Sequence, residues 1–453
     1  MKKRKRLALS TTHLILLSFL LAILVGTLLL MLPISSATRE PASFIDALFT
    51  ATTATCVTGL VVVPTVSAWS IFGQLVILVL IQIGGLGIIT VMTGIILSVN
   101  RKMKLSDSIL IQDAFNLNSM SGLGAFLKKV IIGTAIVEGA GALLYMISFI
   151  PKYGLKGIYY AVFTSISAFC NAGIDVIAED SLCSFVTDPI MNITTALLII
   201  LGGIGYIVWW DVIRVFKQRN SIKGKAFKRL TLHSKIAIST TLILIISGAI
   251  LFFAFEYNNP LTMKNLTLIE KIQASFFQSI TTRTAGFATV PQENLTTSSA
   301  ILSLLLMFIG GSPVGTAGGI KTVTIATLVL AAISAIKNKN HVSVFGRRIN
   351  KAAISKSIAV FATSFAIMFI STLLLSCVTN ADTIDILYET VSATATVGLT
   401  RALTPSLNTA GKLIIITTMY LGRVGPISLA IAFLTKKDNP NIINDPLEDI
   451  SVG

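Results

Sequence analysis

The sequence has few charged residues. Asp, Glu, Lys and Arg make up only 12% of its 453 residues, about half the share of an ordinary soluble domain, whereas 53% of the residues are hydrophobic. Segments 13–31, 71–99 and 242–255 are almost free of charge, and several reach the roughly 20 residues that a helix needs to cross a bilayer. These properties exclude a soluble domain and predict a polytopic membrane protein in contact with the lipid bilayer.

Cysteine and histidine are also scarce, with four and three residues in the chain. No two cysteines have the C-x-x-C spacing of a metal site, and a chain of this length does not need a disulfide framework. The three histidines lie near the expected cytoplasmic edges of the apolar segments. The sequence therefore predicts no catalytic residues and no organic cofactor, and we do not expect an enzyme.

The sequence has 20 acidic residues and 36 basic ones. Acidic and basic residues lie in alternate links between the apolar segments. Because the positive-inside rule produces this alternation, we expect a multi-pass protein of the cytoplasmic membrane with both termini and all basic links in the cytoplasm. No link is long enough to form a basic domain, which argues against nucleic acid as a partner. The first apolar segment exceeds the hydrophobic core of a signal peptide, so we expect it to remain as a membrane helix. The basic clusters lie at 2–6, 101–104, 128–129, 214–235, 337–356 and 436–437.

A short polar stretch ending near glycine interrupts the apolar segments four times. Thr-Ala-Thr-Val-Gly-Leu at 394–399 has counterparts at 55–60, 169–174 and 282–287. Its glycines are separated by 114, 113 and 112 residues, and an aromatic residue stands ten positions before each glycine. Each stretch is too short and polar to span a bilayer, but it suits a re-entrant helix buried in protein. The aromatic residues are Phe49, Phe163, Phe276 and Tyr388.

Each polar stretch lies between two apolar segments, and the second segment contains another glycine cluster, at 84–87, 202–205, 310–313 or 422–425. This repetition divides the chain into units 1–100, 101–220, 221–340 and 341–453, the last with a short cytoplasmic tail. The predicted fold is an all-α polytopic membrane protein with four parallel helix–pore-loop–helix repeats around one central ion pore. It would contain eight transmembrane helices and four re-entrant pore helices.

Four parallel units would bring the four glycine turns together at the centre. Glycine permits a backbone in which successive carbonyl groups face the axis, and a ring of carbonyl groups can replace the water around a monovalent cation. The short helices would also point their negative C-terminal ends at this place. A single such turn is ordinarily a helix cap or a re-entrant loop, but four in register favour an ion filter. The predicted ion-binding residues are Val57, Thr58, Gly59, Asn171, Ala172, Gly173, Thr284, Ala285, Gly286, Thr396, Val397 and Gly398.

With these four turns, the sequence resembles the Trk/Ktr/HKT superfamily of potassium transporters, above all the membrane subunit of bacterial Ktr-type systems. The resemblance covers essentially the whole chain and implies potassium uptake, with K⁺ bound at the filter residues. Glycine rather than serine at Gly59 implies a preference for K⁺, whereas Asn171 and Ala172 make the filter uneven. The resemblance also implies a homodimer of membrane subunits above a cytosolic regulatory ring that binds ATP/ADP or NAD(H). It leaves dependence on Na⁺ open.

The second apolar segment of unit 3 is rich in glycine. Five glycines and one proline within 310–319 are incompatible with a regular helix. A kinked helix is one interpretation, and the resemblance implies another, a flexible intramembrane loop that restricts ion passage below the filter. We adopt the second. The predicted gate residues are Gly310, Gly311, Ser312, Gly315, Thr316, Gly318, Gly319, Lys321 and Arg423.

Arg423 stands where the other units have glycine or serine, 25 residues after Gly398. An arginine inside a membrane span normally faces a partner or water, and the resemblance implies an electrostatic barrier beside the gate loop. An ion pair with Glu138 is the alternative. We also predict that Arg283 and Glu389 form a structural pair that braces the short helices.

Other classes of membrane protein fit these features less well. A secondary-active cation symporter with a midplane binding site commonly has inverted repeats, whereas the repeats here are parallel. A receptor or a purely structural protein would not need four glycine turns in register.

Overall fold

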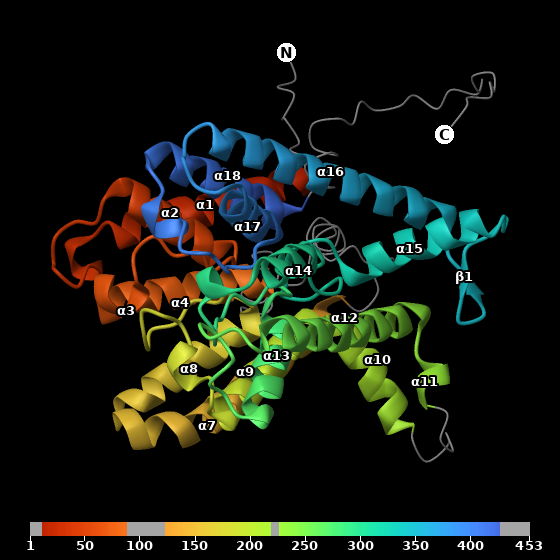
Figure 1. The fold of residues 1–453 in the computed structure, drawn as a ribbon, viewed down its shortest axis with the longest axis horizontal. Coiled ribbons are helices and arrows are strands. Elements are labelled where there is room, and N and C mark those ends of the chain that lie inside the picture. The colour runs from red at the N-terminus through yellow and green to blue at the C-terminus, as the bar shows by residue number, and fades with distance from the viewer. Residues whose placement is uncertain (1–10, 88–122, 219–225, 426–453) are drawn as a thin grey trace, which may run out of the picture.

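The computed structural model describes residues 11–87, 123–218 and 226–425. This part of the chain is almost entirely helical (Figure 1). Its strands, within the described residues, are β1 (Ser343–Val344) and β2 (Arg347–Arg348), which form an antiparallel hairpin with Ser343 opposite Arg348. The segments predicted to carry the terminal charges, 2–6 and 436–437, and the basic link at 101–104 lie outside the described residues.

Among the described residues, four helices are long and apolar enough to cross a bilayer. They match the first helix expected in each unit, and most of their surface is exposed, as in helices that face lipid. Helix α12 begins after Thr231, whose hydroxyl accepts a hydrogen bond from the Ser234 amide, and α16 begins after Asn350 in the same way. The four helices are α1 (Thr11–Leu30), α7 (Leu123–Tyr153), α12 (Leu232–Glu256) and α16 (Lys351–Ser376).

Four shorter helices precede the glycine turns. They have 12 to 15 residues, too few to cross a bilayer, and their central residues are buried. Thr267 and Glu270 form a capping box that fixes the start of the third one. These helices are α2 (Phe44–Thr55), α8 (Lys156–Cys170), α13 (Leu268–Thr281) and α17 (Thr383–Ala395).

The second apolar segment of each unit is less regular than the sequence predicts. In unit 2, α9 (Pro189–Gly203) and α10 (Tyr206–Lys217) meet at an angle of 98°, so a single straight span there is wrong. Gly205, at φ 92°, supplies a backbone conformation at this bend that side-chain-bearing residues resist. In unit 3, α14 (Thr297–Phe308) and α15 (Thr322–Ile336) are separated by a loop. In units 1 and 4, α4 (Ile71–Leu86) and α18 (Thr409–Val424) run up to residues outside the described part, so the count of eight crossings stays a prediction.

Short helical turns connect the longer helices. Within the three described ranges, most of them follow a glycine turn or lie next to the start of a longer helix. They are the α-helical turns α3 (Thr65–Ala68) and α11 (Ala226–Arg229) and the 3-10 turns η1 (Pro33–Ser35), η2 (Cys183–Phe185), η4 (Gln292–Asn294) and η5 (Thr404–Ser406).

The helices pack in a closed cycle. The second helix of each unit contacts the short helix of the next: α4 packs on α8, α9 on α13, α14 on α17, and α18 on α2 (Figure 1). In units 1, 2 and 4, the second glycine clusters let the second helix also lie close to the short helix of its own unit. A β-carbon at Gly84, Gly202 or Gly422 would collide with the carbonyl group of Thr55, Phe169 or Thr394 at the end of a short helix. The cycle places the ends of the four short helices, and the turns after them, in the middle of the described structure.

Candidate ion-binding turns and intramembrane loop

The four glycine turns form a closed ring. Each turn has a residue in the left-handed conformation two positions before its glycine, with φ between 51° and 67°. A β-carbon on any of the four glycines would lie closer than 3.0 Å to a carbonyl oxygen of the next turn, a distance that real β-carbons do not keep. The ring therefore leaves no room for a side chain at these positions. The pairs are Gly59 with Ala172, Gly173 with Ala285, Gly286 with Val397, and Gly398 with Thr58.

Hydrogen bonds connect the turns to the short helices that precede them. The Thr58 amide donates to the Thr53 carbonyl group at 2.8 Å, and the Gly59 amide donates to the Thr53 hydroxyl at 3.0 Å. Ser392 makes the same two contacts with Val397 and Gly398 in unit 4. These turns thus direct their N–H groups toward the short helices. In units 1 and 4, the hydroxyl six residues before the glycine is the feature of the sequence that could have predicted these hydrogen bonds. The predicted site residues do not include it.

The carbonyl oxygens of the turns have no such partner. Within residues 11–87, 123–218 and 226–425, no hydrogen bond reaches a carbonyl oxygen of 57–59, 171–173, 284–286 or 396–398. Buried carbonyl groups are normally paired, so a set of unpaired ones around a single ring can coordinate a cation. The structure brings all twelve predicted filter residues into this ring and its immediate turns.

The aromatic residues before the turns are not equivalent. Phe49, Phe163 and Tyr388 are fully buried, whereas Phe276 is 41% exposed and its neighbour Phe277 is buried instead. The equal spacing in sequence therefore conceals a different orientation of the third short helix.

Residues 309–321 form a loop and not a kinked helix. The loop is closed at its base, where the Gly310 amide donates to the Ile320 carbonyl group and the Thr322 amide to that of Gly311. It docks on the bend between α9 and α10: the amides of Ser312 and Thr316 donate to the carbonyl groups of Gly203 and Gly202. This docking explains the glycine at 315, because a β-carbon there would crowd the backbone of the bend.

Thr316 joins the loop to one of the turns. Its hydroxyl donates to the Phe169 carbonyl group at 3.0 Å and to Asn171 Oδ1 at 3.3 Å. Asn171 belongs to the unit 2 turn, where the sequence departs from the other three. Lys321, at the other end of the loop, donates to the Ala317 carbonyl group. The loop thus lies directly against the turn of unit 2.

Arg423 contacts the loop and not Glu138. Its guanidinium group donates to the Thr316 carbonyl group at 2.7 Å and also to the Gly84 carbonyl group. Glu138 instead accepts a hydrogen bond from Gln82 at 3.2 Å. The alternative ion pair is therefore wrong, and Arg423 links the loop of unit 3 to α4 of unit 1.

The predicted pair of Arg283 and Glu389 is also wrong. Arg283 donates to the Gly310 carbonyl group at 3.3 Å, at the level of the loop. Glu389 accepts hydrogen bonds from Thr400 and Thr404, beyond the turn of unit 4. The two residues lie three and nine positions before their glycines, so Arg283 follows the end of α13 whereas Glu389 lies in the middle of α17.

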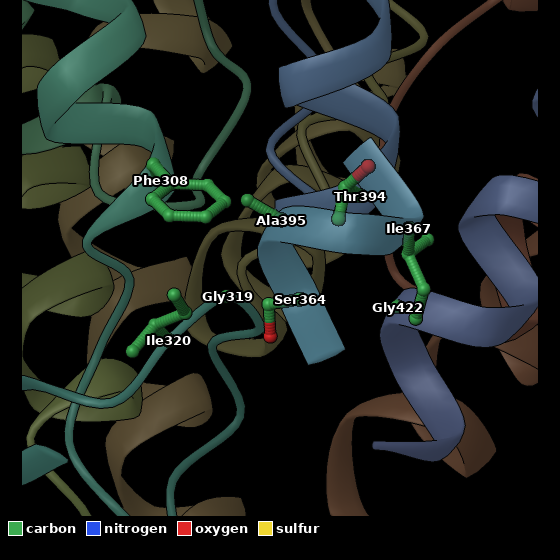
Figure 2. A pocket seen from close by; sticks show the side chains of 8 residues that line it. All are labelled: Phe308, Gly319, Ile320, Ser364, Ile367, Thr394, Ala395 and Gly422. Atoms are coloured by element: carbon green, nitrogen blue, oxygen red, sulfur yellow. The ribbon is translucent and has the colours of Figure 1, made fainter. Parts of the chain in front are cut away.

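A small cavity borders the end of the loop. Figure 2 shows Gly319 and Ile320 on one side of it and side chains of α16, α17 and α18 on the other. Its lining residues are Phe308, Gly319, Ile320, Ser364, Ile367, Thr394, Ala395 and Gly422.

Long apolar helices and short buried helices that end in a ring of backbone carbonyl groups define a helical membrane protein of the ion-transporting class. The chain belongs to the TrkH family of cation transport proteins, whose family model matches residues 2–444. This family consists of transporters and not of enzymes.

Known proteins resemble the chain over almost its whole length. It is 40% identical to the Ktr system potassium uptake protein B of Bacillus subtilis over 94% of this chain and 93% of that protein. It is 38% identical to the potassium/sodium uptake protein NtpJ of Enterococcus hirae over 100% of this chain and 99% of that protein. The crystal structure of the potassium transporter TrkH from Vibrio parahaemolyticus matches with a TM-score of 0.75 at 16% identity, covering 96% of this chain and 86% of that one. This likeness shows that the folds agree.

Proposed function

We propose that the protein takes up K⁺ across the cytoplasmic membrane through a filter formed by the four glycine turns. The observation that carries this proposal is the closed ring of turn carbonyl groups, which accept no hydrogen bond from the described residues. Each carbonyl dipole offers a cation a replacement for a water ligand. The names of the two relatives above, a potassium and a potassium/sodium uptake protein, support K⁺ as the cargo.

The loop at 309–321 is the gate in this proposal. It lies against the turn of unit 2, contacts Asn171 through Thr316, and is held by Arg423. A fixed positive charge at this depth opposes a cation leaving the filter, since the low-dielectric surroundings screen it weakly. Motion of the loop and of Arg423 would open the path.

A cytosolic regulatory protein controls the gate in this proposal, and two membrane subunits form a homodimer. The support is that two relatives, 40% and 33% identical, are named as components B and D of a Ktr system. Nucleotide control by ATP/ADP or NAD(H) would then reside in the regulatory protein. The four-repeat arrangement, eight crossings and cytoplasmic termini complete the proposed architecture.

Uptake by a potassium-requiring cell tests the function. Expression of the chain with its regulatory protein should restore growth at low K⁺ and drive accumulation of K⁺ and Rb⁺. Comparing initial rates with and without Na⁺ separates simple K⁺ uptake from Na⁺-coupled symport, which the NtpJ name favours as a second candidate. Failure to accumulate K⁺ or Rb⁺ at normal protein level would refute the proposal.

A further inference from the structure

A network of buried polar side chains lies behind the turns of units 3 and 4. Gln278 on α13 and Tyr388 on α17 are completely buried, and Gln292 in η4 is 3% exposed. Long polar side chains are rarely buried this deeply without a reason. No role in ion binding or in the gate accounts for these three residues.

The three side chains are joined by hydrogen bonds. Gln278 Nε2 donates to Gln292 Oε1 at 2.7 Å, and Gln292 Nε2 donates back to Gln278 Oε1 at 3.1 Å. The Tyr388 hydroxyl donates to the same Gln292 Oε1 at 3.0 Å, while Gln292 Nε2 also donates to the Val290 carbonyl group at 2.7 Å. A buried network whose members are satisfied in this way is rigid.

The network lies close to the supports of both turns. Tyr388 lies in one buried apolar cluster with Val397 and Leu399, which flank Gly398. On the other side, α13 ends at Thr281, whose carbonyl group accepts from the Ala285 amide and whose hydroxyl donates to the Phe287 carbonyl group. Gln292 therefore connects the supports of Gly286 and Gly398 across the boundary between the units.

A second tie lies beside the first. Arg401, which follows the turn of unit 4, donates to the Gln292 carbonyl group at 2.9 Å and forms an ion pair with Asp385 on α17 at 2.7 Å. Both the backbone and the side chain of Gln292 thus connect η4 of unit 3 with unit 4.

The other units lack these groups at the corresponding positions. Phe49 and Phe163 stand where unit 4 has Tyr388, and neither has a hydroxyl. The counterparts of Gln278 are Ala51, Ser165 and Thr390, and the last two donate to backbone carbonyl groups instead. A similar bond joins units 1 and 2, where the Tyr159 hydroxyl donates to Gln74 Oε1 at 2.9 Å, but it uses other positions of the repeat.

We propose that Gln278, Gln292 and Tyr388 are positioning residues for ion selectivity. They fix the distance between the turns at 284–286 and 396–398, so the ring resists the inward contraction that the smaller Na⁺ requires. This inference rests on the proposed function of the turns as the filter.

The test measures initial uptake of K⁺ and of Na⁺ per folded molecule, using the full chain in a potassium-uptake-deficient cell. Tyr388→Phe removes one hydroxyl and restores the residue type of units 1 and 2. The double variant Gln278→Met with Gln292→Met replaces both amides by apolar groups of similar length, so no buried amide is left unpaired. Tyr145→Phe is the matched control, because Tyr145 is equally buried and its hydroxyl bonds Thr195 at 2.6 Å, a contact between α7 and α9 that does not involve Gln278, Gln292 or Tyr388.

We expect Tyr388→Phe to lower the ratio of K⁺ to Na⁺ uptake about fivefold, the effect of one buried hydrogen bond. The double variant should lower it at least as much, and Tyr145→Phe should not change it. An unchanged ratio in both network variants would overturn the proposal, and so would an equal change in Tyr145→Phe. Gly398→Ser is included because it tests the filter itself. If it changes the ratio and the network variants do not, only the positioning role fails; if it also has no effect, the filter assignment fails.

Discussion

At the scale of single residues, the turns depend on glycine for two separate reasons. Gly286 adopts φ 84°, which most side-chain-bearing residues resist, and a β-carbon there would lie 2.6 Å from the Val397 carbonyl oxygen. Both the backbone conformation and the close approach of the next turn thus exclude a β-carbon at this residue. The ring can keep its carbonyl groups close together only while the side chain is absent.

Gly286→Ser should therefore lower the apparent affinity for K⁺ and weaken the rejection of Na⁺. The conformational cost alone is about 1–2 kcal/mol, and the crowded carbonyl groups must also move apart. The concentration dependence of K⁺ uptake, with Na⁺ as competitor, measures both effects. Gly154→Ser is the control, because Gly154 also has a positive φ but a β-carbon there meets nothing within 4 Å. Unchanged discrimination in both Gly286→Ser and Gly398→Ser would contradict the filter.

Asp175 is the second residue-scale feature. It follows Gly173 by two residues, in the link after α8, and burial raises the pKa of its carboxyl to about 6. Hydrogen bonds from the amides of Ile177 and Ala178 oppose this rise, and the nearby Asp180 adds to it. The carboxyl is therefore charged above about pH 6 and neutral below it.

Lowering the pH from about 7.5 to about 5 should reduce the apparent affinity for K⁺, because it removes a negative charge beside the turn of unit 2. Asp175→Asn should show the reduced affinity at both pH values. The measurement is the half-saturating K⁺ concentration for uptake as a function of external pH. Glu179→Gln removes an exposed carboxyl from the same link and should leave the pH dependence intact. An Asp175→Asn protein with the original pH dependence would eliminate this carboxyl as its source.

At the scale of elements, the loop at 309–321 connects three units of the chain. Its backbone bonds the bend between α9 and α10, its Thr316 hydroxyl bonds the turn of unit 2, and Arg423 of α18 bonds the Thr316 carbonyl group. Glycine makes this compact path possible, since β-carbons at 310, 311 and 318 would collide with neighbouring atoms. The contacts that hold the loop to the other units are thus mainly polar ones.

Arg423→Ala, or a deletion within 315–319, should raise the maximal rate of K⁺ uptake and leave the apparent affinity nearly unchanged. The barrier is weakened in both variants, whereas the ring of carbonyl groups is untouched. Rates should be normalised to the amount of folded protein, because the arginine also satisfies the buried carbonyl groups of Thr316 and Gly84.

Two variants serve as controls for the gate. Lys412→Ala removes a basic residue from the same helix, but Lys412 pairs with Asp46 away from the loop, so the rate should not rise. Glu138→Gln should likewise not reproduce the effect of Arg423→Ala, since Glu138 bonds Gln82. If neither gate variant transports faster at normal protein level, the loop is not the barrier.

At the scale of the whole molecule, the four units close into a cycle in which each second helix packs on the next short helix. Every unit therefore contributes to the support of two turns. The same arrangement leaves α10, α11 and the hairpin of β1 and β2 on one side of the described structure (Figure 1). Basic residues on these elements include Arg214, Lys217, Lys228, Arg229, Arg347 and Arg348.

We expect the chain to copurify with a cytosolic regulatory protein and to transport at a rate that depends on nucleotide bound by that protein. The physical reason is that a regulatory protein that binds one position of the loop more tightly than another shifts the equilibrium between them by that difference in binding free energy. Copurification from a mild detergent, followed by uptake into proteoliposomes with and without nucleotide, checks both statements. Fully regulated transport by the purified chain alone would contradict them.

The class of the protein, the four glycine turns and the four long helices could all be predicted from the amino-acid sequence, because each follows from local composition or from regular spacing. Low charge and long apolar segments require a membrane, and glycine repeated at intervals of 112 to 114 residues requires a repeated backbone conformation. The family comparison agrees with the resemblance based on these motifs. Glycine and proline at 310–319 likewise predicted an interruption of the helix, and the family resemblance favoured a loop over a kinked helix.

Which side chains meet is a property of the folded chain. Arg283 and Glu389 precede equivalent turns in sequence, yet Arg283 follows the end of α13 and bonds the loop, whereas Glu389 lies within α17 and bonds residues after its turn, so no pair forms. Arg423 bonds carbonyl groups of two other units and not Glu138, and the loop of unit 3 docks against the exposed backbone of the bend between α9 and α10. The network of Gln278, Gln292 and Tyr388 also joins residues up to 110 positions apart. Such contacts depend on how the units pack around the ring, and the spacing of residues within one unit does not specify that packing.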